Sequence, residues 1–317
     1  RYAEAAELHG TVLAEQRRQL GPAHPDTVGS ALNYAFVLDR LGRRDEAITL
    51  LEEMVAICNS AFAPDARETI TAVNSLAVMY AKEGRYADAA PLFEQAYSTS
   101  LESVGPDHPG TITAQHNLAR LYEHIDQLEE AESTMREVVA KRTRVLGPDH
   151  PDTLAAQGSL GRILRRMSRF DEAEAVVGDV LDNRRAQLGP THPDTLTTER
   201  DYANILLDLH RPAEAEAHLS AALAGFEKTL PPTHELIVTT RLALGVSILE
   251  QQRYAESAEI LEEVLTTLKE QKGIAHPTTQ RAARALLQAY ESQGETESTK
   301  EIRAMLTTTD TASAPND

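Results

Sequence analysis

The chain has 317 residues with 49 acidic and 31 basic side chains, so its formal net charge is −18. This charge argues against nucleic acid as the main partner, because phosphates would be repelled. No apolar stretch approaches the roughly 20 residues that cross a bilayer, so the sequence predicts no membrane partner. Trp is absent while Ala and Leu are abundant, which is typical of helices packed through small residues.

The chain contains a single cysteine, Cys58, which cannot form an internal disulfide. It lies in a predicted helix, and we expect it to be a small core residue rather than a reactive thiol. Low cysteine usage fits a reducing compartment, so we expect a cytoplasmic protein.

One short phrase returns along the chain every 42 residues, with phrase-final positions at 27, 69, 111, 153, 195, 237 and 279. The clear copies are Gly21–Thr27, Gly105–Thr111, Gly147–Thr153 and Gly189–Thr195, and the weaker copies are Ala63–Thr69, Pro231–Ile237 and Gly273–Thr279. A strict repeat of this length predicts a solenoid, in which each repeat buries its apolar face only against its neighbours. We therefore expect one domain over residues 1–306.

The repeats can be placed in chain order. Residues 1–20 form a half repeat, because Arg1 to Ala6 align with Arg85 to Ala90, two periods later. Full repeats are expected to start near residues 25, 67, 109, 151, 193, 235 and 277. Because the alignment begins in mid-repeat, we expect the chain to be a piece of a longer protein. Residues 307–317 are rich in Thr, Ser, Ala, Pro and Asn, which predicts a disordered tail.

Each repeat is predicted to contain two helices. Counted from the phrase-final residue as position 0, apolar residues stand at positions 7 and 11 with a small residue at position 8, which makes one helical stripe. A breaker or polar residue follows at position 15, and a second helix opens with acidic residues and carries a small residue at position 20. The phrase glycine ends this second helix, and the second proline starts the next first helix. We expect seven first helices, called A helices, and eight second helices, called B helices.

The pattern at positions 7, 8, 11, 20, 24 and 27 resembles the tetratricopeptide repeat. The 42-residue period and the Gly-Pro-x-His-Pro-x-Thr connector resemble its kinesin-light-chain type, in the form found in bacteria. The resemblance covers residues 1–306 and implies an all-α, right-handed superhelical solenoid whose A helices line a concave groove. It implies a non-catalytic scaffold that binds an extended peptide segment. The alternative is the C-terminal sensor or docking region of a bacterial Ser/Thr protein kinase or similar signalling enzyme, whose catalytic domain lies upstream.

Six histidines share one loop position, namely His24, His108, His150, His192, His234 and His276. Metal ligands must converge on one ion, whereas these residues lie one per repeat, so we expect each to cap or pack its own loop. The sequence shows no Gly-rich phosphate cradle, no Ser/His/Asp order and no metal-spaced cluster. We therefore expect no enzymatic activity, no metal and no cofactor.

The resemblance implies that positions 2, 5, 6, 9, 12 and 13 of the A helices face the groove. Amide and imidazole groups at these positions could bind a peptide main chain, since one Asn both donates and accepts: Asn33, Asn74, His116, Asn117 and Asn204. In the family an Asn at position 6 clamps the peptide main chain, a role that Asn33 and Asn117 inherit. Apolar residues flank this region and could form pockets or pack between repeats: Phe36, Val78, Leu207, Val246 and Leu249.

Basic residues gather at the groove positions of the middle repeats: Lys82, Arg120, Arg162, Arg165, Arg166 and Arg200. Guanidinium groups pair with carboxylate or phosphate, so the cluster indicates an acidic or phosphorylated peptide. The alternative is that these side chains neutralise Asp and Glu on neighbouring helices. A further possibility is self-association through the exposed N-terminal B helix.

Overall fold

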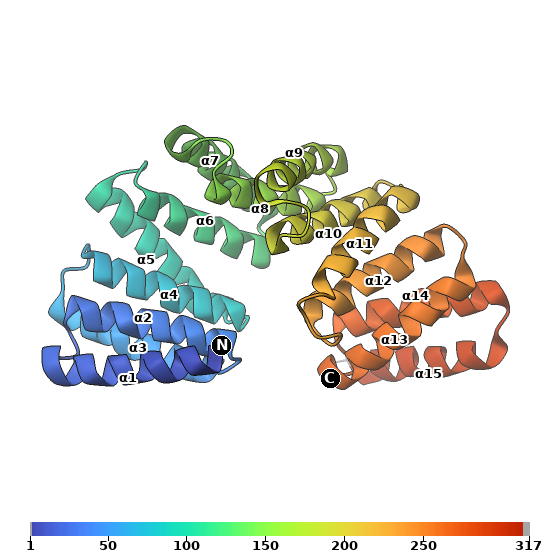
Figure 1. The fold of residues 1–317 in the computed structure, drawn as a ribbon, viewed down its shortest axis with the longest axis horizontal. Helices are drawn as coiled ribbons and strands as arrows, with labels where there is room; N and C mark the ends of the chain where they lie inside the picture. Colours follow the sequence, from blue (N-terminus) through green and yellow to red (C-terminus); the bar gives the residue numbers. More distant parts are fainter. Residues whose placement is uncertain (1, 313–317) are drawn as a thin grey trace. The chain divides into compact units, whose positions relative to one another are not determined.

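The computed structural model describes residues 2–312, which form 15 helices in sequential antiparallel pairs (Figure 1). The eight expected B helices are α1 (Tyr2–Leu20), α3 (Arg44–Ala61), α5 (Tyr86–Val104), α7 (Leu128–Leu146), α9 (Phe170–Leu188), α11 (Pro212–Phe226), α13 (Tyr254–Lys272) and α15 (Thr296–Ala312). The seven A helices are α2 (Pro25–Arg40), α4 (Arg67–Lys82), α6 (Pro109–His124), α8 (Pro151–Arg166), α10 (Pro193–Asp208), α12 (Glu235–Glu250) and α14 (Pro277–Gln293). The predicted all-α solenoid of paired helices is confirmed.

The chain forms two compact bodies, Arg1–Ile163 and Leu164–Asp317, and the division falls inside α8. Within each body consecutive helices pack on one another, α1 to α7 in the first and α9 to α15 in the second. The sequence repeat continues through the division, and the single-domain organisation remains a prediction. The expected boundary at residue 306 falls within α15, which continues to Ala312, while residues 313–317 of the predicted tail lie outside the described residues.

Small residues let the two helices of a repeat approach closely. The position-20 side chains are completely buried in six repeats, at Ala47, Ala89, Ala131, Ala173, Ala215 and Ser257. The hydroxyl of Ser257 donates a hydrogen bond of 2.8 Å to the carbonyl of Gly245, the position-8 residue of the same repeat. A Cβ atom on Gly245 would lie only 2.8 Å from the Leu261 side chain. In this repeat positions 8 and 20 are therefore small because the two helices pack closely there.

The turn between the two helices of each repeat requires a left-handed residue at position 15. All seven residues at this position have positive φ, between 57° and 77°: Gly42, Gly84, Asp126, Ser168, His210, Gln252 and Gly294. The next backbone N–H then bonds back to the position-11 carbonyl, as Arg85 does to Tyr80 at 2.9 Å. Four repeats hold a non-glycine residue in this costly conformation.

The six loop histidines act as helix caps, as expected. Nδ1 of each accepts a hydrogen bond of 3.1–3.2 Å from the backbone N–H two residues later, at the start of an A helix. This bond satisfies one of the N–H groups that a helix start leaves without a partner. Among the described residues, no group of three or more His, Cys, Asp or Glu is placed to hold a metal ion.

The weaker loop at residues 63–69 lacks this cap. Ala66 stands at the N-cap of α4 with φ −63° and ψ 140°, close to the −72° and 138° of His24, but it offers no side-chain acceptor. We expect Ala66→His to raise the free energy of unfolding by about 1 kcal/mol, as measured by urea denaturation. The reverse change, His24→Ala, should cost a similar amount. Equal stabilities for wild type and Ala66→His would contradict a capping role.

The remaining sequence expectations concern the core and the membrane. Cys58 is completely buried, and burial raises the pKa of its thiol, so it is a core residue as predicted. Among the helices that the structure describes, none combines the length and the apolar character needed to cross a membrane.

Candidate functional site

A pocket lies in the first body between α4, α5 and α6, where α4 packs on α5 and α5 on α6. Its volume is about 250 Å³. It is lined by residues of α4, α5 and α6: Val78, Ala81, Lys82, Tyr86, Phe93, Asn117, Arg120, Leu121 and His124. The rings of Tyr86 and His124 stack with their centroids 5.3 Å apart. We call this the A-face pocket. Three of its residues, Lys82, Asn117 and Arg120, were predicted from the sequence.

Two predicted asparagines meet beside this pocket. Nδ2 of Asn117 donates a hydrogen bond of 2.9 Å to Oδ1 of Asn74 on the neighbouring A helix. This bond uses one donor of Asn117 and one acceptor of Asn74. Oδ1 of Asn117 can still accept, and Nδ2 of Asn74 can still donate. The pair therefore keeps one acceptor and one donor, the two kinds of group that a peptide unit requires.

Lys82 belongs to a charge network across three helices. Its ammonium forms an ion pair with Asp39 of α2, which also accepts a hydrogen bond of 2.8 Å from Arg44. Arg44 in turn pairs with Glu83 at 2.7 Å. Burial opposes the ionisation of Asp39, but the hydrogen bonds from Lys82 and Arg44 hold the pKa of its carboxyl below its usual range. The cation of Lys82 is therefore compensated from within the protein.

Arg162 and Arg120 differ in their partners. Arg162 forms a two-point ion pair with Glu123 of α6, at 2.7 and 2.8 Å, and Glu123 is only 3% exposed. Arg120, at the pocket rim, makes no hydrogen bond or ion pair with any residue that the structure describes. Burial and the nearby charge of Arg162 lower the pKa of Arg120, against the opposing effect of Glu123. A guanidinium at a pocket rim whose N–H groups are not bonded to a carboxylate is suited to an anionic ligand group.

His116 does not line the A-face pocket, although the sequence analysis predicted it among the groove residues. It is 9% exposed and faces α7, where Nη1 of Arg142 lies 3.3 Å from its Nδ1. Burial, with the charges of Arg142, Arg120 and Arg162, lowers the pKa of His116 to about 3. The reason is its place at position 5, which in this repeat turns towards the following B helix. A side chain so placed is a structural group.

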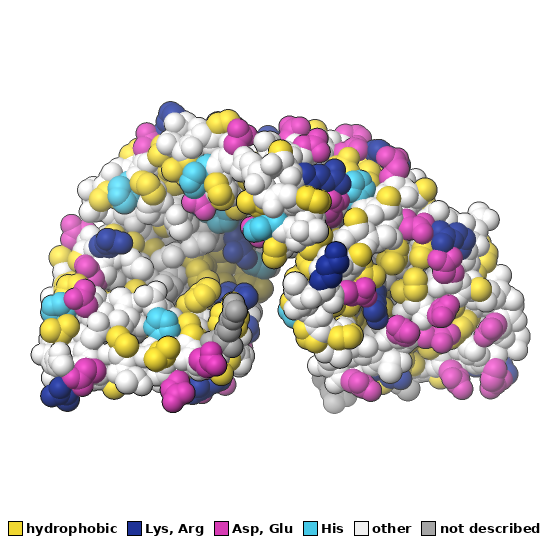
Figure 2. Space-filling model, in the orientation of Figure 1, with side chains coloured by type: hydrophobic (Ala, Val, Ile, Leu, Met, Phe, Trp, Pro, Cys, Tyr) yellow, Lys and Arg dark blue, Asp and Glu magenta, His cyan; other side chains and the backbone are white. Residues whose placement is uncertain are grey.

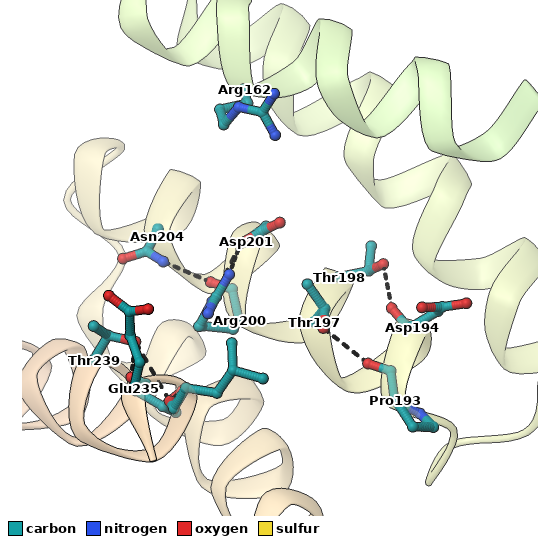
Figure 3. Close-up of polar contacts among 12 residues, drawn as sticks. Arg162, Pro193, Asp194, Thr197, Thr198, Arg200, Asp201, Asn204, Glu235 and Thr239 are labelled. Carbon is teal, nitrogen blue, oxygen red and sulfur yellow. Dashed lines mark hydrogen bonds and ion pairs between the residues drawn. The ribbon is translucent and has the colours of Figure 1, made fainter. Parts of the chain in front are cut away.

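The predicted residues of the second body are mostly engaged. Arg165 forms an ion pair with Asp208 of α10. Figure 3 shows Arg200 bonded to the carboxylate of Asp201 at 2.9 Å, and Nδ2 of Asn204 donating to the Arg200 carbonyl at 2.9 Å.

The other predicted residues are accounted for individually. Arg166 is exposed at the end of α8. Asn33 is exposed on α2 and lines a separate pocket of about 380 Å³. Leu207 and Leu249 are buried packing residues, and Phe36 is 56% exposed.

Pairing between neighbouring repeats thus explains much of the basic cluster, as the alternative interpretation held. Figure 2 likewise shows basic side chains in dark blue interspersed with acidic ones in magenta. Three acids that the sequence analysis did not single out provide these pairs: Asp39, Glu123 and Asp208. Their sequence signal is a spacing of 39 or 43 residues from the base, close to one repeat.

Family models described as tetratricopeptide repeats match residues 27–65, 68–143, 122–186, 169–228 and 201–272. The chain belongs to the tetratricopeptide repeat family. Arrays of this family, abbreviated TPR, generally mediate protein–protein interactions and are usually non-catalytic. No match was found among curated proteins.

Solved structures show which TPR proteins this chain resembles. Kinesin light chain TPR-like repeats of Podospora anserina are 25% identical with a TM-score of 0.54, over 66% of this chain and 98% of that one. The apo form of RapI has a TM-score of 0.63 at 11% identity, over 98% and 97% of the two chains. A signal transduction ATPase with a TPR sensor from Pyrococcus horikoshii gives 0.63 at 11% identity, over 90% of this chain and 42% of that one. The kinesin-light-chain likeness seen in the sequence is confirmed.

Proposed function

We propose that this TPR array is a non-catalytic scaffold that binds an extended, acidic segment of a partner protein at the A-face pocket. The observation that supports the proposal is the position of Arg120, whose guanidinium makes no hydrogen bond or ion pair with any described residue. It stands beside an apolar cavity and near the Asn74–Asn117 pair, which keeps one hydrogen-bond acceptor and one donor for a ligand. These are the three kinds of group that peptide recognition combines.

Each part of the pocket has its own role in this proposal. The Asn74–Asn117 pair holds one peptide unit, since Asn117 Oδ1 accepts from its N–H and Asn74 Nδ2 donates to its C=O. Val78, Phe93 and Leu121 receive an apolar side chain of the segment. Arg120 then pairs with an acidic side chain nearby. Because each contact is modest, affinity requires all three at once.

Arg120→Glu tests the proposal by placing a negative charge where the ligand carboxylate would lie. We expect binding of acidic peptides to fall by at least about tenfold. The measurement is fluorescence anisotropy with labelled heptapeptide pools that carry a central Glu. Arg18→Glu is the matched control, since Arg18 is exposed on α1 and the change in total charge is identical. An equal loss in both variants would show a general charge effect and contradict a site at Arg120.

The proposal also covers the cellular location of this TPR array and its possible place in a larger signalling enzyme. A cytoplasmic location is supported by the single, buried cysteine. The alternative role, a sensor or docking region attached to a bacterial Ser/Thr kinase or similar enzyme, concerns residues beyond this chain. Sequencing the encoding gene upstream of Arg1 tests it directly, because a kinase domain would show a Gly-rich loop and catalytic Asp motifs.

We also propose self-association through α1. Leu8 and Val12 lie one turn apart on this helix and are 67% and 46% exposed. A two-fold interface would cover this patch in both copies at once. We expect a concentration-dependent dimer by light scattering, and expect Leu8→Glu with Val12→Glu to give a monomer. Phe36→Glu, at another exposed apolar residue, is the control that should still dimerise. A wild type that is monomeric at all concentrations would overturn this proposal.

A further inference from the structure

A second pocket of the first body lies at the other end of α5 from the A-face pocket, between the starts of α4 and α6. Its volume is about 560 Å³, and its lining includes Asp65, Arg67, Ile70, Ser100, Val104 and Gly110. We call it the connector pocket. Ser100 is only 2% exposed, and its hydroxyl makes no hydrogen bond with any residue that the structure describes. A buried hydroxyl that lines a cavity without a partner is available to a ligand.

The 42-residue period shows which group later repeats place at the position of Ser100. One and two periods later the chain carries Arg142 and Arg184. The guanidinium of Arg142 donates to the carbonyl of Asp152 at 2.7 Å. That of Arg184 donates to the carbonyl of Asp194 at 3.2 Å. Each acceptor is the second residue of an A helix, so each arginine joins the end of a B helix to the start of the next A helix.

The connector pocket keeps the acceptor of this contact and lacks the arginine. The residue equivalent to Asp152 and Asp194 is Gly110, whose carbonyl stands at the start of α6. The side chain of Ser100 is too short to reach across as arginine does, and Gly110 adds no side chain of its own. Together these two differences leave space where the later repeats hold a guanidinium.

A second arginine is also missing from this end of α5. In the next repeat Arg144, near the end of α7, forms an ion pair with Asp107 of the preceding connector. The equivalent residues here are Glu102 and Asp65, which carry the same charge and cannot pair. The carboxylate of Asp65 accordingly makes no hydrogen bond or ion pair within the described part of the chain. The pocket therefore combines a backbone carbonyl, a hydroxyl and a carboxylate, all of which can accept.

Arg67 also lines the connector pocket but does not neutralise Asp65. Its side chain is exposed and is not bonded to any described residue. It lines the neighbouring pocket of about 380 Å³ as well, together with Asp26 and Glu68. Because two carboxylates stand on that side, Arg67 can turn towards them when a cation occupies the connector pocket.

We propose that the connector pocket binds an arginine side chain of a partner protein. The guanidinium donates to the carbonyl of Gly110, as Arg142 does in the next repeat to its equivalent acceptor. It pairs with Asp65, and the hydroxyl of Ser100 accepts a further N–H group. The site is separate from the A-face pocket and does not depend on the binding of an acidic segment there.

The arrangement favours arginine over lysine. A guanidinium has five N–H donors in a planar fork, so it can reach several acceptors at once, whereas an ammonium is a compact point charge. The methylene groups of the side chain pack on Ile70 and Val104, which line the same pocket.

The test uses labelled heptapeptide pools that differ only in the central residue, which is Arg, Lys or citrulline, the neutral analogue of Arg. Fluorescence anisotropy gives the relative affinities. For the wild type we expect the Arg pool to bind at least about fivefold more tightly than the Lys pool, and the citrulline pool to bind no better than the Lys pool. Equal binding of the Arg and Lys pools would show a general attraction to this acidic chain and would overturn the inference.

Ser100→Arg should fill the pocket from within the chain and reduce the affinity of the Arg pool to that of the Lys pool. Ser98→Arg is the matched control, because Ser98 lies two residues away on α5, is exposed, and gains the same charge. Equal losses in the two variants would contradict a site at Ser100. Arg120→Glu should leave the preference for Arg over Lys in place, so this inference and the proposed function can fail separately.

Asp65→Asn keeps the inference testable if Ser100→Arg does not fold. Asp65 is exposed and without contacts to other charges, so its replacement should leave the fold intact. We expect the affinity for the Arg pool to fall at least about threefold. Asp45→Asn, at an exposed acid of α3, is the control for the lost charge. An unchanged affinity in Asp65→Asn, or an equal fall in both variants, would overturn the inference.

Discussion

Ala89→Leu is expected to lower the free energy of unfolding by about 3 kcal/mol, because it overfills the closest contact between two helices. Ala89 is completely buried on α5 and packs in one cluster with Ala77 of α4, which is also completely buried. Three added carbon atoms have no space there, so α4 and α5 must separate. Phe93 and Leu121 belong to the same cluster and line the A-face pocket, so peptide binding should weaken as well.

Ala87→Leu is the matched control for this substitution. Ala87 lies two residues away on the same helix and is exposed, so the same side chain meets only solvent there. Because leucine forms helices nearly as well as alanine, we expect a change below about 0.5 kcal/mol. Urea denaturation of both variants gives the comparison. Similar losses in the two variants would mean that α5 responds to leucine itself, and the close-contact explanation would be wrong.

The fold could be predicted because its determinants are local and recur in every repeat. A small residue at position 20, such as Ala89, indicates a close helix contact whichever helix provides the other side. The loop histidine at position −3, such as His24, lies directly before the helix that it caps. The left-handed conformation at position 15 could not be predicted in the same way, since Asp126, Ser168, His210 and Gln252 rarely adopt it. There the bond closing the turn outweighs the local preference.

The site could be predicted only in part because it depends on contacts between repeats. The sequence analysis named Asn117 and Arg120, and both line the A-face pocket. It did not show that Lys82 reaches Asp39, a residue 43 positions earlier, because that contact depends on how far adjacent A helices are offset. Position 5 also failed as a guide for His116, which turns towards α7. The family pattern indicates which face of a helix lines the groove. It does not fix the direction of a side chain at the border of that face, such as that of His116.

His116 should make the stability of this protein strongly dependent on pH. Its pKa is about 3 in the folded chain, against an ordinary value of 6.5, because burial and the nearby arginine charges disfavour the imidazolium. Between these two values the unfolded chain binds a proton that the folded chain does not. The stabilising contribution is therefore fully present above pH 6.5 and is lost progressively as the pH falls towards 3.

From about pH 7.5 to about pH 5 this single residue should cost about 2 kcal/mol of unfolding free energy, before most carboxylates begin to titrate. His116→Gln removes the titrating group and keeps an oxygen that can accept from Arg142. We expect wild type to lose about 2 kcal/mol more than His116→Gln over this interval, as measured by urea denaturation at each pH. Parallel pH profiles would show that the pKa of His116 is not lowered in the folded chain, so that His116 is protonated there at about pH 5. In that case the contact with Arg142 could not be a hydrogen bond, because both groups would then be donors.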